Sequence, residues 1–488
     1  MKNILEYLEH SAARVPEKVA FADGETSLTF EAVLREAKAV GSALLRRGIT
    51  GRPVALLMKR QPETIAAFLG CLYGGCSYVP LDIQMPLSRI RQILSTVQPA
   101  AIICQRGTAS MAEALPGEIL LYDTLKSCPV EEAALLQVRE NQIDLDPVYT
   151  VFTSGSTGVP KGVTGCHRAV LDYIENLCPV LGFDENTVFG SQAPLYFDAC
   201  LKEIMPTLKF GATTHLIPKQ LFLFPVPLVE YLSTHRINTL CWAVSALTMI
   251  SGTGTLEEVK PEYLRTVAFA GEVMPPKQLR LWQRALPGVR FFNLYGPTEA
   301  TGICCYYQVD REFADQEAIP VGRPFPNTRV LLINGEICIQ GSRLTLGYYR
   351  EPEKTAESFS QNPLHDLYPD RIYHTGDLGA YNEQGQLLFL GRKDCQIKHM
   401  GHRIELGEIE AAAACCDGVR EAAAGYEEGR ILLFYAGDAG EGDVSGHLQS
   451  LLPRYMLPEY YECLPVLPRT PNGKLNRLAL KPGKEILP

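Results

Sequence analysis

The sequence predicts an α/β protein: a large N-terminal domain with doubly wound, mostly parallel sheets plus a β-rich subdomain, and a small α+β domain at the C-terminus. Three observations predict this organisation. Short apolar strands alternate with amphipathic helices along most of the chain, a β-rich stretch follows, and the final stretch mixes both patterns anew. The length of 488 residues exceeds one ordinary core, so at least two domains are expected.

The alternation begins near the N-terminus. Residues 4–13 and 30–46 carry apolar side chains at helical spacing, residues 54–58 and 100–104 are short apolar strands, and a helix is expected from about 63 to 72. Strand and helix in alternation are typical of a parallel sheet with helices on its faces. Further strands of this kind are expected at 213–217, 239–242, 265–270 and 289–292.

The later part of the chain changes character. Residues 329–340 and 387–390 predict a β-rich region. The α+β unit at the end contains expected helices at 405–416 and 446–452 and expected strands at 421–425 and 431–434. The stretch 391–394 between the two parts is interpreted as a linker. The predicted domains are therefore residues 1–393 and 394–488.

Composition and charge disfavour several classes of function. The chain is 46% apolar and 21% charged, with a formal charge of −9 and no basic tract, which disfavours nucleic acid or an anionic membrane as a partner. Acidic residues interrupt the N-terminus early, so no signal peptide is expected, and no segment reads as a membrane span. The 15 cysteines form no CxxC pair, and the vicinal pairs lack zinc-type spacing. We interpret them as reduced, mostly buried thiols of a cytoplasmic protein; a redox or metal centre is the disfavoured alternative.

The strongest local signal is residues 149–162, Tyr-Thr-Val-Phe-Thr-Ser-Gly-Ser-Thr-Gly-Val-Pro-Lys-Gly. A β-like run leads into a loop of glycines and hydroxyls that ends in Lys161. Glycines let backbone N–H groups approach an anion, and a lysine adds charge against phosphate. The loop lacks the Gly-Lys-[Ser/Thr] ending of a Walker motif. On composition alone, a phosphate loop and a plain surface loop are about equally favoured.

Three further segments suit a nucleotide. Residues 293–299, Asn-Leu-Tyr-Gly-Pro-Thr-Glu, follow a strand, where open α/β sheets bind ligands. Residues 373–377, Tyr-His-Thr-Gly-Asp, place a carboxylate after a turn glycine, which suits paired ribose hydroxyls. Residues 471–474, Pro-Asn-Gly-Lys, place a lysine in a turn that could swing. Each segment alone could equally be a turn or a salt-bridge partner.

Together and in this order, the segments resemble the adenylate-forming superfamily of acyl-CoA synthetases, luciferases and amino-acid adenylation domains. Within it the chain is most similar to adenylation domains of nonribosomal peptide synthetases and to D-alanine–carrier protein ligases. The resemblance covers almost the whole chain and rests on residues 28–31, 78–82, 153–162, 197–198, 270–272, 293–299, 335–339, 391–410, 452–458 and 472–474.

The resemblance implies an enzyme that activates an amino acid in two half-reactions with ATP and Mg²⁺. The carboxylate first attacks the α-phosphorus of ATP and gives an acyl adenylate and pyrophosphate; a pantetheine thiol then displaces AMP and gives a thioester. Negative charge crowds at the α-phosphate in the first step, so cations must be aimed there. No carrier or condensation segment is found in the chain, so the expected partner is a separate phosphopantetheinyl carrier protein.

The resemblance also assigns residues. Lys474 contacts the substrate carboxylate and the α-phosphate region, Thr298 contacts the α-phosphate, and Glu299 holds Mg²⁺. Asn293 and Tyr295 frame the adenine. The full set implied to bind the cofactor is Thr153, Ser154, Gly155, Ser156, Thr157, Gly158, Lys161, Gly271, Glu272, Asn293, Tyr295, Gly296, Asp377 and Arg392. Asp377 binds the ribose hydroxyls, and Arg392 supports the ribose.

A domain rotation is implied between the two steps. Asp394 lies where the family has its hinge, and rotation of the small domain would remove Lys474 and present the strand around Lys398. A solvated strand residue is the alternative interpretation of Lys398.

Asp198 decides between the amino-acid and other substrate classes. An aspartate here pairs the substrate α-ammonium group in amino-acid-activating members, whereas lipid-activating acyl-CoA synthetases generally lack it. The side-chain pocket is then expected to comprise Ala199, Lys202, Cys241, Ala268, Ala270, Leu294, Gly302 and Ile303, with the place of Cys241 open by one residue. A cation from Lys202 slightly favours an acidic substrate such as glutamate. If Lys202 instead pairs with Asp198, a small neutral amino acid such as D-alanine is favoured.

Other function classes remain as alternatives. One is an acyl-CoA synthetase for a non-amino carboxylic acid. Another is an inactive binding protein, which the retained Lys474, Asp377 and Glu299 disfavour. The sequence also departs from the family pattern: His374 stands where an arginine is usual, the loop at 330–335 is short, and Gly165-Cys166 precede His167 where polar or β-branched residues are commoner.

Overall fold

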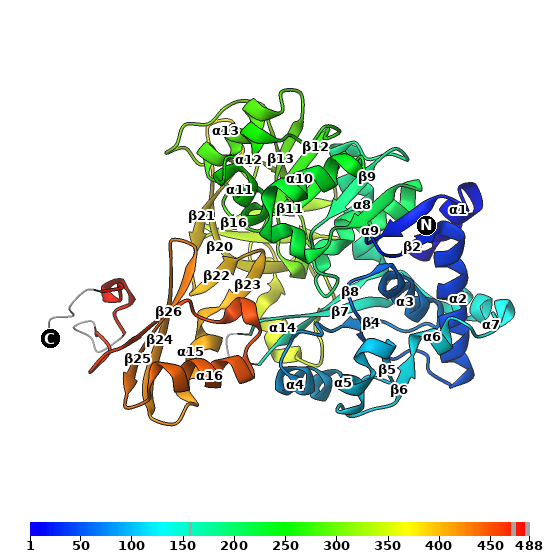
Figure 1. Ribbon diagram of the computed structural model, residues 1–488, viewed down its shortest axis with the longest axis horizontal. Coiled ribbons are helices and arrows are strands. Elements are labelled where there is room, and N and C mark those ends of the chain that lie inside the picture. The colour runs from blue at the N-terminus through cyan, green and yellow to red at the C-terminus, as the bar shows by residue number, and fades with distance from the viewer. Residues whose placement is uncertain (156–158, 470–474, 484–488) are drawn as a thin grey trace. The chain divides into compact units, whose positions relative to one another are not determined.

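The computed structural model describes residues 1–155, 159–469 and 475–483 (Figure 1). Its contacts divide the chain into two compact units. Unit 1 comprises residues 1–82, 97–151 and 163–393, and unit 2 comprises residues 83–96, 152–162 and 394–488. Two segments of the N-terminal part therefore pack with the C-terminal part. The assignment of domains as 1–393 and 394–488 stays a prediction.

Seven strands, most of them from the first third of the chain, form one sheet. In spatial order it comprises β18 (Gly347–Tyr348), β8 (Lys161–Cys166), β7 (Pro147–Thr153), β4 (Tyr78–Pro80), β3 (Val54–Leu57), β5 (Ile102–Cys104) and β6 (Ile119–Leu121). The pairs around β3, β4 and β5 are parallel, as the alternation of strands and helices predicts.

The second sheet of unit 1 has nine strands. In spatial order it comprises β15 (Arg323–Pro324), β14 (Cys305–Val309), β13 (Arg290–Tyr295), β12 (Thr266–Ala270), β11 (Thr239–Ala243), β9 (Val188–Ser191), β10 (Thr213–Leu216), β1 (Val19–Ala22) and β2 (Ser27–Thr29). Its central strands are parallel and both edges are antiparallel. The carboxyl ends of β11, β12 and β13 therefore meet at one edge of the sheet.

Helices cover both faces of the nine-stranded sheet. One core cluster joins both sheets to α1 (Leu5–Arg14), α2 (Phe30–Arg46), α3 (Pro62–Tyr73), α8 (His167–Leu181) and α9 (Leu201–Phe210). A second cluster lies under α10 (Pro225–Thr234), α11 (Val244–Gly252), α12 (Thr255–Glu258) and α13 (Pro276–Ala285), which Figure 1 shows in green beside β11–β13. The doubly wound α/β class is thus confirmed.

A β-rich part completes unit 1. It comprises β16 (Thr328–Ile333), β17 (Glu336–Gly341), β19 (Phe359–Gln361), β20 (Arg371–Tyr381) and β21 (Leu387–Arg392). The short loop noted in the sequence is a two-residue hairpin: Asn334 and Gly335 both have positive φ, of 52° and 80°, and Ile333 pairs with Glu336. Asn-Gly suits such a turn because both positions need positive φ. The expected linker at 391–394 begins inside β21, because Arg392 pairs with Asp377 on β20.

Unit 2 combines two small sheets with helices. It comprises α4 (Leu87–Val97), β22 (Gln396–His399), β23 (His402–Glu405), α15 (Leu406–Ala414), β24 (Val419–Glu427), β25 (Arg430–Gly437), α16 (Glu441–Leu451) and β26 (Tyr460–Cys463). Helix α4 is joined to α15 by an ion pair between Arg89 and Glu408, both almost fully buried. Breaking such a pair would leave an uncompensated buried charge, so it ties the two helices together strongly.

The remaining helices are α5 (Ala109–Glu113), α6 (Tyr122–Leu125), α7 (Glu132–Asn141) and α14 (Pro352–Ser358). In the described part of the chain, no helix combines the length and the apolarity needed to cross a membrane. All 15 cysteines are free and most are buried, as their scatter in the sequence predicts.

Candidate active site

The predicted side-chain pocket falls at the carboxyl ends of three parallel strands. Cys241 on β11 pairs with Ala268 on β12, and Ala270 pairs with Leu294 on β13. Side chains alternate between faces along a strand, so Cys241, Ala268 and Leu294 belong to one core cluster, whereas Trp242 belongs to the other. The register therefore puts Cys241, and not its neighbour, on the face of the pocket residues.

Asp198 is a buried carboxylate with an open acceptor. It begins a short 3₁₀ turn, Asp198–Cys200, and is 8% exposed. Its Oδ2 has no hydrogen-bond partner. Burial raises the pKa of Asp198 to about 6, although the Thr298 hydroxyl and the Lys202 charge lower it. A buried carboxylate in this state favours a cationic partner, because a cation would remove the cost of its desolvated charge.

Lys202 and Glu203 follow on α9, and both are almost fully buried. The Lys202 ammonium donates to the Ala199 carbonyl at 2.9 Å. Neither carboxylate oxygen of Glu203 has a hydrogen-bond partner, and burial raises its pKa to about 7, against the opposing charges of Lys202 and Arg60. The Lys202 charge thus acts on two buried carboxyl groups, Asp198 and Glu203.

The structure adds Tyr173, which was missing from the predicted pocket. A Cβ atom at Gly302 would lie 3.6 Å from both Asp198 Oδ2 and the Tyr173 hydroxyl. Tyr173 is 1% exposed, and burial with the nearby Asp198 charge raises its pKa well above the usual value. Its phenol therefore stays protonated beside Asp198. The signal in the sequence was faint: one hydroxyl on the apolar face of helix α8.

The turn after β13 places Thr298 and Glu299. Gly296 is required there, because a Cβ atom would come within 2.3 Å of the Gly302 carbonyl oxygen. Glu299 is fully buried; its Oε1 accepts from the Tyr348 hydroxyl at 2.8 Å, and its carbonyl accepts from the Thr345 N–H at 2.9 Å. These bonds fix the carboxylate behind the strand ends.

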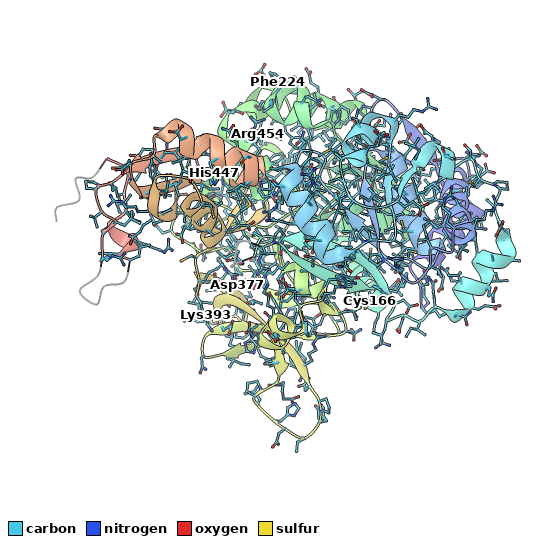
Figure 2. The ribbon with its side chains drawn as sticks, turned by 90° about the horizontal axis from the view of Figure 1, so that it is seen from below. Cys166, Phe224, Asp377, Lys393, His447 and Arg454 are labelled. Atoms are coloured by element: carbon cyan, nitrogen blue, oxygen red, sulfur yellow. The ribbon has the colours of Figure 1, made fainter. Side chains whose placement is uncertain are left out.

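Asp377 receives two donors from neighbouring strands. Its Oδ2 accepts from the Tyr295 hydroxyl at 2.5 Å and its Oδ1 accepts from Arg392, which also donates to the Thr375 carbonyl at 3.1 Å. Burial and the Asp377 charge raise the pKa of Tyr295 well above its usual value, so the phenol remains a donor. The structure thus brings together Tyr295, Asp377 and Arg392, three residues implied to bind nucleotide. Figure 2 labels Asp377 on this β-rich part, close to Lys393.

Other predicted residues have structural partners. Gly271 has a φ of 90°, and the Glu272 carboxylate accepts the Ser245 N–H at 2.7 Å in the first turn of α11. The Asn293 side-chain amide donates to the Pro320 carbonyl at 2.9 Å. These two contacts order the loops around the strand ends.

The stem of the predicted phosphate loop belongs to unit 2. The Ser154 hydroxyl donates to the Arg403 carbonyl at 2.7 Å and accepts from the Glu405 N–H at 3.1 Å, and both residues lie on β23. Thr153 Oγ1 is buried without a hydrogen-bond partner. Ser154 can hold phosphate, as predicted, only if it exchanges its two bonds to β23.

The rest of the predicted set is dispersed or outside the described residues. Lys398 lies on β22, paired with Arg403, and the Asp394 side chain accepts from the Gln396 N–H at 3.2 Å. Lys161 begins β8, and Gly155 packs closely, since a Cβ there would lie 2.0 Å from the Val159 carbonyl oxygen. Ser156, Thr157, Gly158 and Lys474 lie outside the described residues.

The donors near β13 fit a magnesium ion. Glu299 contributes a buried carboxylate and Thr298 a hydroxyl, and Mg²⁺ prefers such hard oxygen ligands. The two residues predicted at this metal position, Thr298 and Glu299, offer oxygen ligands and no sulfur.

Comparison with known proteins places these residues in context. The family model described as "AMP-binding enzyme" matches residues 8–349. The chain is 31% identical to D-alanine--D-alanyl carrier protein ligase of Staphylococcus aureus, over 98% of each chain. It is 30% identical to tyrocidine synthase 1 of Brevibacillus parabrevis, over 98% of this chain but only 45% of that protein.

Solved structures agree in fold. The chain superimposes on holo-PA1221, an NRPS protein containing adenylation and PCP domains, with a TM-score of 0.86 and 25% identity, over 98% of this chain and 84% of the other. The NpsA-ThdA adenylation-PCP di-domain from Klebsiella oxytoca gives a TM-score of 0.81 at 23% identity, over 95% and 94% of the two chains. The second likeness bears on the fold alone.

Proposed function

The chain belongs to the AMP-binding enzyme family, with ligases among its relatives, and from this premise we propose that it activates an amino acid with ATP and Mg²⁺ as the aminoacyl adenylate. The acyl group then passes to the pantetheine thiol of a separate carrier protein. D-alanyl carrier protein and PCP domains occur in the names of its relatives, which supports a carrier as the acceptor.

The observation that carries this proposal is the unpartnered Oδ2 of Asp198. An amino acid brings an α-ammonium group, and a buried carboxylate with an open acceptor is the complement of that group. A fatty or aryl acid would leave Asp198 Oδ2 without a cationic partner from the substrate. The amino-acid class is therefore favoured over an acyl-CoA synthetase for a non-amino acid.

The nucleotide is assigned to the residues around β13. Asp377, held by Tyr295 and Arg392, presents a carboxylate to the ribose hydroxyls, and Glu299 with Thr298 would hold Mg²⁺. The ion would neutralise charge that develops between the α-phosphate and the leaving pyrophosphate. Lys474, outside the described residues, is the proposed cation for the substrate carboxylate. Lys398 and the Asp394 hinge are proposed to serve the thioester step.

The charge balance of the pocket favours a small neutral substrate such as D-alanine. The Lys202 cation is bonded to the Ala199 carbonyl and faces two buried carboxyl groups, Asp198 and Glu203. An acidic side chain would add a third carboxylate to one ammonium. The contacts of Lys202 thus support the small neutral substrate over the acidic one that the sequence alone slightly favours.

Pyrophosphate exchange over a panel of D- and L-amino acids, glutamate and aryl acids tests the proposal. We expect the highest kcat/KM for a small neutral amino acid. We expect no pyrophosphate exchange with acids that lack an α-amino group. Lys202→Ala should leave that preference within a few-fold. A wild type that prefers glutamate, with selective loss of glutamate in Lys202→Ala, would establish the acidic alternative. A preferred non-amino acid would refute the amino-acid class altogether.

A further inference from the structure

His374, the departure from the family pattern at the start of the Thr-Gly-Asp segment, does not face the nucleotide residues. It belongs instead to a cluster with Glu336 and Cys338 on two strands of the β-rich part, β17 and β20. Its Nδ1 lies 3.4 Å from the Cys338 sulfur and 3.1 Å from Glu336 Oε2. The three ligand atoms lie within 4.8 Å of one another, and the described residues contain no other such group of His, Cys, Asp or Glu.

Strand register creates this convergence. Cys338 on β17 pairs with His374 on β20, and Glu336 begins β17 directly after the Asn334–Gly335 turn. The register of β17 against β20 is irregular between Glu336, which pairs with Leu378, and Cys338, and the Glu336 carboxylate lies 3.1 Å from His374 Nδ1. Cys338 is fully buried and Glu336 nearly so, whereas His374 is partly exposed and opens the cluster to solvent.

Both ring nitrogens of His374 lie within hydrogen-bond distance of a neighbour. Nδ1 lies 3.1 Å from Glu336 Oε2 and 3.4 Å from the Cys338 sulfur, and Nε2 lies 2.9 Å from Ser360 Oγ. A zinc ion on Nδ1 would require the ring proton on Nε2, where the Ser360 oxygen can accept it while its own proton goes to the Gln361 carbonyl. A hydrogen-bond partner on the distant ring nitrogen is the usual arrangement behind a metal-binding histidine.

We propose that Glu336, Cys338 and His374 bind a zinc ion. Zinc takes sulfur, imidazole and carboxylate ligands, and its bond lengths imply about 3.5 Å between neighbouring ligand atoms of a tetrahedral site. The separations of 3.4 and 3.1 Å are close to this value. Water supplies the fourth ligand.

Zinc binding would release one proton and displace one cation of the protein. A thiol binds zinc as the thiolate, so the proton of the Cys338 thiol leaves to solvent as the Zn–S bond forms. Lys393 donates to Glu336 Oε2 at 2.8 Å and competes with the ion for this oxygen. Lys393 is half-exposed and can turn to solvent as zinc enters.

Isothermal titration with Zn²⁺ tests the site in a protein whose exposed cysteines, Cys395, Cys415 and Cys463, are changed to serine. We expect one zinc ion per chain and one proton released. His374→Arg places a cation beside the Glu336 carboxylate, so it should fold, but it removes the nitrogen ligand and should weaken binding at least tenfold. The control His10→Arg, an exposed histidine elsewhere, should leave the affinity unchanged.

Two further variants separate ligation from a general effect of charge. Cys338→Ala should weaken zinc binding at least tenfold and abolish the thiolate-to-metal charge-transfer absorption that Co²⁺ gives in the parent. Lys393→Gln should tighten binding several-fold by removing the competing ammonium. Absence of stoichiometric zinc binding in the parent, or binding that both His374→Arg and Cys338→Ala leave intact, would overturn the proposal.

Discussion

Two buried aspartates of unit 1 have opposite surroundings. Asp377 accepts from Tyr295 and Arg392, so the protein itself compensates its charge. Asp198 has an oxygen with no partner and a pKa raised to about 6. Under the proposed roles, the carboxylate for the ribose is held in place by the fold before the ligand arrives, whereas the carboxylate for the α-ammonium group carries a cost of desolvation until its ligand binds.

The largest effect is expected when the paired aspartate is removed. Asp377→Ala removes the carboxylate that pairs with the Arg392 guanidinium, whose side chain is only 12% exposed, so the free energy of unfolding should fall by about 3 kcal/mol. If Asp377 binds the ribose hydroxyls as proposed, two charge-assisted bonds are lost, and pyrophosphate exchange at fixed ATP should fall at least about 100-fold. Urea denaturation and exchange assays measure the two losses.

Asp370→Ala is the matched control for this variant. Asp370 directly precedes β20 and is 8% exposed, and its carboxylate accepts hydrogen bonds from the Asn362 and Gln340 side chains. Its loss should reduce stability while leaving the KM for ATP within a few-fold. A similar rise of that KM in both variants would mean that Asp377 acts through stability alone.

Replacing the unpaired aspartate should have the opposite effect on stability. The folded pKa of Asp198 lies above its ordinary value of 3.8, so its contribution to stability is fully present below about pH 3.8 and is lost as the pH rises through about 6. Asp198→Asn removes the buried charge and should raise the free energy of unfolding at pH 8 by up to about 3 kcal/mol. The KM for the amino acid should rise about 10- to 100-fold, with the KM for ATP little changed.

Denaturation at pH 8 and at pH 4 checks the sign, since the stabilisation of Asp198→Asn should shrink at the lower pH. A variant that is less stable than wild type at pH 8 would contradict the assignment of Asp198 as an uncompensated charge.

The pH dependence of substrate binding sharpens the comparison further. Below about pH 6 a proton on Asp198 removes the charge that would bind the α-ammonium group. The KM for the amino acid should therefore rise by up to about tenfold per pH unit below 6. Asp198→Asn should abolish this dependence, and its persistence in the variant would assign the titration to another group.

The smallest effect is expected from Glu203, the second carboxyl group near Lys202. Glu203→Gln frees the Lys202 cation from one of its two neighbouring carboxyl groups. The ratio of kcat/KM for glutamate to that for a neutral amino acid should rise about two- to fivefold, because a single screened charge–charge interaction changes binding by about this factor. Pyrophosphate exchange assays with both substrates give this ratio. A fall in the ratio would contradict an electrostatic effect of Glu203 on the substrate pocket.

Much of the fold was accessible from the sequence because it depends on near neighbours in the chain. The helix expected at 30–46 is α2, and the strands expected at 239–242 and 265–270 are β11 and β12, within one or two residues at each end. The order of the motifs likewise indicated the AMP-binding family. Periodicity and turn chemistry are local, so they can be read without tertiary contacts.

The pairing of side chains could not be read in this way. Ser154 has the same hydroxyl in any loop, yet its bonds to Arg403 and Glu405 depend on a strand far along the chain. The sequence suggests an acidic substrate or Asp198 as the partner of Lys202, whereas in the structure the Lys202 ammonium donates to the Ala199 carbonyl and a second buried carboxyl group lies at Glu203.

The sequence by itself determined the fold class, the family and the chemical types of the site residues. Only the tertiary structure decided which carboxylates are compensated, which strands meet around His374, and that residues 83–96 and 152–162 pack with the C-terminal part. The physical reason is range: helix and strand patterns arise within a few residues, whereas the pKa and the partners of a buried charge depend on atoms that folding brings from distant parts of the chain.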